Sequence, residues 1–265
     1  MAFQAHDISD DRRSSRSRMA NMVRAYSDEL VWLYFPLSPD EKICGFWVMR
    51  MLGGLATVAI YTSYGRSRIF GPYVNPESHS DVTIKCLNGS RDGYVKAIFY
   101  NDLRSKGAER DLRLAISSTQ DIKVEVPEHP PWPIGRVPYL CMHTEQPWYY
   151  SKASLKGIRS IEICRHNTTL VCFGISIHYD DQSREVLGQW RFDQYIGNLP
   201  TGDYPYIHFH VNFSNGNPCV QDIQFEPHRG IDQAGWTSIP MNGCLVWWFS
   251  KSGGVVVHEQ DMEAD

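Results

Sequence analysis

The chain has 265 residues, of which 42% are hydrophobic and 12% aromatic, so it can bury a sizeable core and is not intrinsically disordered. Its net charge of -4 gives no overall attraction to phosphate backbones or anionic lipid, and we expect neither nucleic acid nor a membrane as a partner. Seven dispersed cysteines without a C-x-x-C pair argue against a disulfide framework or a zinc site. With no apolar leader at the start of the sequence, these features predict a cytoplasmic protein.

The sequence predicts one disordered segment and one folded region. Residues 1–24 are rich in Asp, Arg and Ser, and we expect them to form a disordered N-terminal arm. We interpret residues 25–265 as an all-β domain, either a single fold or two similar halves, 25–126 and 139–258. The halves would be joined by a proline-rich strap at 127–138, because proline removes ladder donors and fixes φ.

Short apolar runs between turn residues predict strands along the whole folded region. In the first half we expect strands at 29–35, 43–49, 55–62, 66–70, 82–86, 94–100, 112–116 and 122–126. In the second half we expect strands at 158–163, 170–179, 185–190, 206–213, 220–225, 243–250 and 254–258. A short helix is considered only near 17–26. The pattern predicts an antiparallel β-prism or β-sandwich built from repeated hairpin units, with little helix.

The clearest element is a β-hairpin over residues 170–191. Its two apolar runs flank Asp180 to Ser183, whose short polar side chains favour a tight turn. The first run alternates apolar with polar or small residues, the period of a half-buried strand. The segment 55–73 echoes this hairpin, which indicates either duplication of one unit or convergence of two ordinary hairpins. The alignment places Gly71 on Gly188, Val58 on Ile175, Ile60 on Ile177, Phe70 on Leu187 and Tyr73 on Trp190.

The hairpin at Phe70-Gly71-Pro72-Tyr73 ends in Gly-Pro-aromatic and resembles the jacalin-related lectins, over residues 43–73 and again over 157–191. The resemblance implies a β-prism of three Greek-key sheets and carbohydrate binding. In that family the sugar sits on a Gly-x-x-x-Asp loop after the last strand pair. The comparable turn, Ser252-Gly253-Gly254, has no Asp four residues beyond either glycine, so no sugar-binding residue is carried over. The phrases EVLGQWR and LVWWFS also resemble uncharacterised filamentous-fungal proteins, which implies no function.

Aromatic residues are the main candidates for a binding site, because sugar rings and planar apolar ligands stack on flat aromatic surface beside polar groups. We expect Trp132, Trp148 and Tyr149, in or beside the strap, to be exposed, since that segment cannot form regular sheet. Trp190 lies near a hairpin end. Trp248 must face opposite to its neighbouring tryptophan, so it can line a pocket.

His208 and His210 complete the predicted ligand-binding set. They lie two residues apart in a predicted strand and therefore share one face of it. A third ligand such as His178, Glu226 or His228 would make a metal site. Two ligands alone do not make a metal site, so we predict no bound metal.

No catalytic residue is assigned. Asp180 and Asp181 fit a turn better than a catalytic carboxylate pair, and Cys164 near His166 fits a buried thiol better than a nucleophile. The sequence contains no G-x-S-x-G, P-loop, dinucleotide or H-E-x-x-H motif. This removes the commonest hydrolase, kinase and Rossmann mechanisms, and no cofactor is predicted.

We therefore expect a non-catalytic, lectin-like module that binds a glycan or another small molecule. One alternative is an enzyme on a β scaffold, such as a cyclase or isomerase of secondary metabolism, with an aromatic-lined pocket and a His, Asp or Glu that moves a proton. The other is a protein-interaction module that docks through the arm and the strap. The oligomeric state is left open. A closed cavity holding a titratable residue would favour the enzyme, and a shallow polar surface with an exposed aromatic would favour the lectin.

Overall fold

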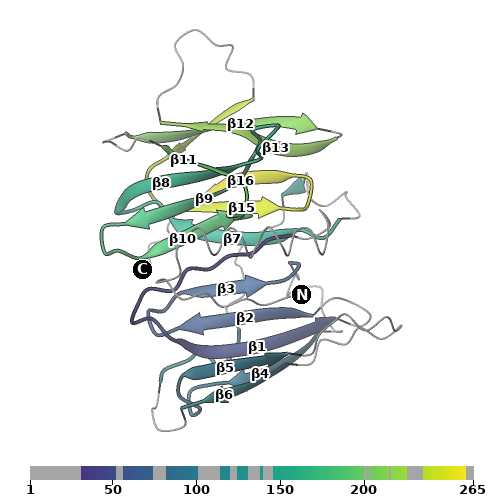
Figure 1. Cartoon of the computed structure of the whole chain (residues 1–265), viewed down its shortest axis with the longest axis vertical. Coiled ribbons are helices and arrows are strands. Elements are labelled where there is room, and N and C mark those ends of the chain that lie inside the picture. Colours follow the sequence, from purple (N-terminus) through teal and green to yellow (C-terminus); the bar gives the residue numbers. More distant parts are fainter. Residues whose placement is uncertain are drawn as a thin grey trace. The chain divides into compact units, whose positions relative to one another are not determined.

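The computed structural model describes residues 31–51, 56–73, 82–100, 114–119, 124–130, 138–139, 146–199, 202, 204–214, 216–225 and 235–260. In these segments the chain forms sixteen strands in five antiparallel sheets, which confirms the predicted all-β class (Figure 1). No helix of the described part is long and apolar enough to cross a membrane. The predicted arm, the helix near 17–26 and residues 131–137 of the strap lie outside the described residues.

The described part of the chain forms two compact units. Among the described residues, unit 1 holds those within 39–130, and unit 2 holds those within 31–38 and 138–260. The strand predicted at 29–35 is wrong for its described part, since residues 31–38 form no strand and belong to unit 2. In this segment the Trp32 amide donates to the side chain of Gln189 at 3.1 Å, and the Trp32 carbonyl accepts from the Trp190 amide at 3.4 Å.

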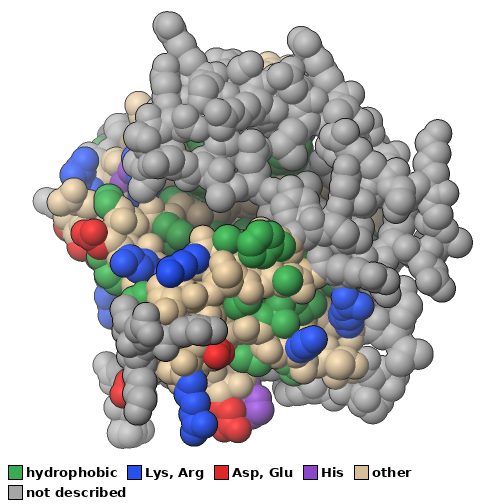
Figure 2. Space-filling model, turned by 60° about the horizontal axis from the view of Figure 1, so that its bottom comes forward, with side chains coloured by type: hydrophobic (Ala, Val, Ile, Leu, Met, Phe, Trp, Pro, Cys, Tyr) green, Lys and Arg blue, Asp and Glu red, His purple; other side chains and the backbone are tan. Residues whose placement is uncertain are grey.

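Unit 1 contains a four-stranded and a two-stranded antiparallel sheet. The first has the order β3-β2-β1-β4, with bounds β1 Ile43–Met51, β2 Thr57–Thr62, β3 Ser67–Phe70 and β4 Val82–Asn88. The second pairs β5 Val95–Tyr100 with β6 Leu114–Ser118. Trp47, Met49 and Ala59 form a buried cluster on one face of the larger sheet. On the side of unit 1 seen in Figure 2, hydrophobic side chains gather between separate Lys and Arg side chains.

Unit 2 is built from three antiparallel sheets that share one core. The first has the order β10-β9-β8-β11, with bounds β8 Ile158–Arg165, β9 Cys172–Tyr179, β10 Arg184–Gly188 and β11 Tyr195–Leu199. The second has the order β13-β12-β14, with bounds β12 Tyr206–Ser214, β13 Asn217–Gln224 and β14 Trp236–Pro240. The third has the order β16-β15-β7, with bounds β7 Tyr149–Ser154, β15 Cys244–Phe249 and β16 Gly254–Glu259. Each sheet turns one apolar face inward, as Ile175, Phe209 and Trp247 illustrate in one buried cluster.

The predicted hairpin is confirmed as β9 and β10. Its turn is closed by the Tyr179 amide, which donates to the Ser183 carbonyl at 3.0 Å. The side chain of Asp181 accepts from the Ser183 amide at 2.8 Å, as expected for a turn residue rather than a catalytic carboxylate. Of the apolar residues at alternate positions, Ile175 and Ile177 are fully buried and Phe173 is half-buried.

The similarity between segments 55–73 and 170–191 extends to the strand order and the register of the two four-stranded sheets. In each sheet the three strands that follow one another in the chain lie side by side, and the fourth pairs with the first of them. The aligned residues occupy equivalent cross-strand pairs, Val58 opposite Phe70 and Ile175 opposite Leu187. The aligned glycines, Gly71 and Gly188, both have positive φ. The two aligned segments therefore share one strand arrangement.

Three strands were not predicted from the sequence, namely β7, β11 and β14. Their segments, YYSKAS, YIGNL and WTSIP, are short and carry few large apolar residues in alternation. Each is held instead by a neighbour from elsewhere in unit 2, such as β15 for β7. Conversely, the strand predicted at 122–126 is wrong for residues 124–126, which form none. Pairing partners, more than local propensity, decide such short segments.

Candidate functional site

The outer face of the sheet β13-β12-β14 in unit 2 gathers aromatic and polar side chains. Strand alternation in β12 sends Ile207 and Phe209 into the core, where both are fully buried. It therefore directs Tyr206, His208 and His210 to the opposite face, where Tyr206 is exposed, His210 is half-buried and His208 is buried. The prediction that the two histidines share a face is confirmed by their cross-strand partners on β14, Ser238 and Trp236.

Two ring pairs form the aromatic part of this face. The rings of His210 and Trp236 stack with centroids 5.1 Å apart and an interplanar angle of 18°. The rings of Tyr206 and His208 lie 6.3 Å apart at 39°. Tyr206 is 47% exposed and Trp236 is half-buried. Gly235, with φ of +84°, makes room for the stack, since a Cβ there would lie 3.1 Å from His210 Nε2.

Hydrogen bonds hold the polar part of the face. His208 Nδ1 lies 2.8 Å from Ser238 Oγ. Asp222 Oδ1 accepts from the Arg165 guanidinium at 2.6 Å, and Asp222 Oδ2 accepts from Gln224 Nε2 at 2.7 Å. Burial by itself would raise the pKa of the Asp222 carboxyl, but the hydrogen bonds from Arg165, Gln224 and the Ile223 amide bring the pKa below its usual value. Asp222 is therefore an ionised hydrogen-bond acceptor, and its hydrogen bonds hold the carboxylate in position.

Most of the aromatic residues that were predicted to bind a ligand lie outside this sheet face. Trp148, Trp190 and Trp248 are only 6%, 3% and 2% exposed, so the expectation that Trp148 is exposed is wrong. Tyr149 is the first residue of β7 and stacks on Phe249 at 5.7 Å, so the expectation that it lies outside regular sheet is also wrong. The cause is the pairing of β7 with β15, which incorporates this segment into a sheet. Trp132 lies outside the described residues.

The neighbouring tryptophans of β15 face opposite ways, as predicted. Trp247 belongs to the core of unit 2, where it meets Phe209 edge-on at 6.2 Å. Trp248 points to the other face and meets Tyr150 at 5.0 Å. Because both indoles are buried, neither presents a ring face to a ligand from solvent.

The cysteine and histidine pair considered for catalysis is structural. Desolvation by burial raises the pKa of Cys164 to about 12, which leaves almost no thiolate at neutral pH. His166 Nδ1 lies 3.1 Å from the amide nitrogen of Thr169, and its ring meets Phe173 edge-on at 5.6 Å. The interpretation of Cys164 as a buried thiol is confirmed.

A second polar cluster joins β8 and β9. His178 Nε2 lies 3.1 Å from Glu162 Oε2 and 3.4 Å from Ser176 Oγ. Both contacts use the same ring nitrogen, whereas a catalytic triad places its serine and its carboxylate on opposite nitrogens of the ring. Ser176 is also buried. The cluster therefore lacks the geometry of a serine nucleophile.

The described residues contain no group of three or more His, Cys, Asp or Glu placed to hold a metal ion. Of the third ligands considered for His208 and His210, Glu226 and His228 lie outside the described residues. His178 stands on β9, in another sheet of unit 2.

Sequence reasoning selected two members of the outer face and left out Trp236, Asp222, Gln224 and Tyr206. The signal for Trp236 is weak, because WTSIP alternates over only five residues. Asp222 and Gln224 alternate with Ile223 in β13, but nothing in the sequence pairs them with His208 and His210.

No protein-family model matches the sequence, and no curated protein is significantly similar to it. The fold and the site define an all-β protein with two compact units, one of which carries a face of stacked aromatic rings and ordered polar groups.

Proposed function

We propose that the chain is a non-catalytic binding module and that a carbohydrate binds on the outer face of β13-β12-β14. The supporting observation is the half-exposed Trp236, stacked on His210 beside the ordered side chains of Asp222 and Gln224. A sugar ring has a face of C–H groups that packs on an aromatic ring and hydroxyl groups that need hydrogen-bond partners. This face supplies both kinds of contact side by side.

The hydrogen bonds of Asp222 suit it to accept a ligand hydroxyl. A carboxylate has about four acceptor positions. Arg165, Gln224 and the amide of Ile223 occupy three of them. These bonds hold the carboxylate in place before the ligand arrives, which reduces the ordering cost of binding.

The architecture of unit 2 also supports a lectin-like function. Three antiparallel sheets around one core are what the resemblance to jacalin-related lectins implied. The turn after β15 holds Ser252 and Gly253 and lacks the aspartate of that family. The binding surface proposed for this chain is accordingly a sheet face and not that turn.

The alternatives have less support. The enzyme would need a pocket around a His, Asp or Glu that moves a proton, whereas the described cavity of unit 1 is lined by Arg, Lys, Thr and apolar side chains. The interaction module would use the arm and the strap, most of which lies outside the described residues.

A glycan array on the full chain, followed by titration calorimetry with the best glycan, tests the proposal. Loss of aromatic stacking costs about 0.5–1.5 kcal/mol, so Trp236→Ala should weaken binding roughly 2- to 13-fold. Trp236→Phe should retain part of the affinity, and Asp222→Asn should reduce it. The matched control is Tyr64→Ala, which removes an exposed aromatic ring from unit 1 and should leave the affinity unchanged. Wild-type protein that binds no glycan, or Trp236→Ala with wild-type affinity, would refute the proposal.

A further inference from the structure

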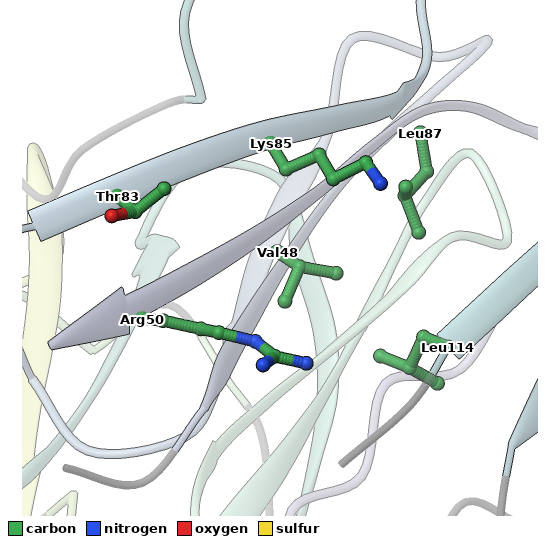
Figure 3. Close-up of a pocket in the computed structure, with 6 residues that line it drawn as sticks. All are labelled: Val48, Arg50, Thr83, Lys85, Leu87 and Leu114. Carbon is green, nitrogen blue, oxygen red and sulfur yellow. The ribbon is translucent and has the colours of Figure 1, made fainter. Parts of the chain in front are cut away.

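Unit 1 contains a cavity of about 380 Å³ between β1, β4 and β6 that the proposed carbohydrate function does not use. Figure 3 shows the side chains that line it, which are Val48, Arg50, Thr83, Lys85, Leu87 and Leu114. Its volume falls in the range of about 300–1,000 Å³ that is typical of small-molecule sites.

The register of β1 with β4 explains why these side chains meet. Val48 lies opposite Lys85, and Arg50, two residues further along β1, lies opposite Thr83. Residues opposite one another in a sheet point to the same face. Leu87, two residues after Lys85 in β4, therefore joins the same face.

The lining combines two cationic groups with an apolar wall. In Figure 3 the guanidinium of Arg50 extends from β1 toward Leu114, and the amine of Lys85 extends from β4 toward Leu87, on the other side of Val48. The hydroxyl of Thr83 adds a further donor.

From this juxtaposition we propose that the cavity binds an amphipathic organic anion, a molecule with one oxyanion head and one apolar body. The guanidinium of Arg50 matches the two oxygens of a carboxylate or phosphate, and the amine of Lys85 adds a second, compact positive charge to the lining. The apolar body lies against Val48, Leu87 and Leu114, where it leaves water. Carboxylate and phosphate heads share this chemistry.

Titration calorimetry of the full chain tests this site with three probes that share one alkyl chain: decanoate, decyl phosphate and decanol. We expect at least one of the two anions to bind, and decanol to bind at least 10-fold more weakly than that anion. The comparison isolates the charge of the head, because the apolar body is the same in all three. No binding of either anion, or decanol binding as tightly as the better anion, would overturn the proposal.

Variants then locate the site. Lys85→Gln and Arg50→Gln should each weaken binding of the anion at least 5-fold, and Leu114→Ser should weaken decanoate and decanol alike. The matched control is Lys96→Gln, which removes an exposed lysine of β5 that does not line the cavity. Circular dichroism confirms that each variant is folded. Equal affinities for Lys85→Gln, Arg50→Gln and Lys96→Gln would place the anion elsewhere and refute the site.

Discussion

Arg165 links two sheets of unit 2 through a single guanidinium. From β8 it donates to Asp222 Oδ1 at 2.6 Å and to the backbone carbonyl of Gln221 at 3.1 Å, both on β13. It also donates to the carbonyl of Leu170 at 3.2 Å. Removing the carboxylate would leave a partly buried cation without its counter-charge, so Asp222 supports the folded state as well as the proposed binding face.

We predict that Asp222 contributes stability that disappears in acid. The folded state has the lower pKa, so the carboxylate stabilises the fold above the unfolded pKa, near 3.8, and this stabilisation is lost as the pH falls through the folded pKa. Urea unfolding of Asp222→Asn should therefore show a loss of stability at pH 7 that shrinks below pH 4. Asp180→Asn, at an exposed turn position, is the control and should show little loss at either pH. A loss of equal size at pH 7 and pH 3 would contradict the prediction.

At the scale of elements, the end of the hairpin β9–β10 depends on two facing glycines. Gly174 and Gly188 are cross-strand partners, and Gly188 has φ of +74°. A Cβ at Gly188 would lie 2.9 Å from Gly174 Cα and still closer to the carbonyl oxygen of Phe173. Both the backbone conformation and the close approach of the strands thus require glycine.

Gly188→Ala should lower the free energy of unfolding by about 2 kcal/mol or more, because left-handed backbone costs roughly 1–2 kcal/mol and the steric overlap adds to it. Gly216→Ala separates the two effects, since Gly216 has φ of +79° but no atom within 4 Å of an added Cβ. Gly216→Ala should therefore lower the free energy of unfolding only by the conformational cost of left-handed backbone, roughly 1–2 kcal/mol. Urea unfolding measures both variants, and losses of the same size would show that the overlap at Gly188 relaxes without cost.

At the scale of the whole molecule, each compact unit buries a core of its own. Trp47 and Met49 belong to a buried cluster of unit 1, whereas Ile161 and Leu245 belong to the large core of unit 2. Chains with more than one core often depart from two-state unfolding.

We predict that calorimetric unfolding of the full chain is not two-state, with a calorimetric enthalpy above the van't Hoff enthalpy. Gly71→Ala should shift the component of unit 1, because Gly71 has φ of +144° and an added Cβ would overlap Thr57. Gly188→Ala should shift the component of unit 2. A single transition that both variants shift equally would show that the units unfold together.

The sequence by itself determined the all-β class and most strands, because apolar alternation is a local property of each strand. It also placed His208 and His210 on one face, since residues two apart in a strand must share it. Tertiary structure alone decided that Trp148 is buried and that Trp236 meets His210. Burial and cross-strand contact depend on which distant segment pairs with which. The sequences of short strands such as β7 and β14 do not indicate which strands they pair with.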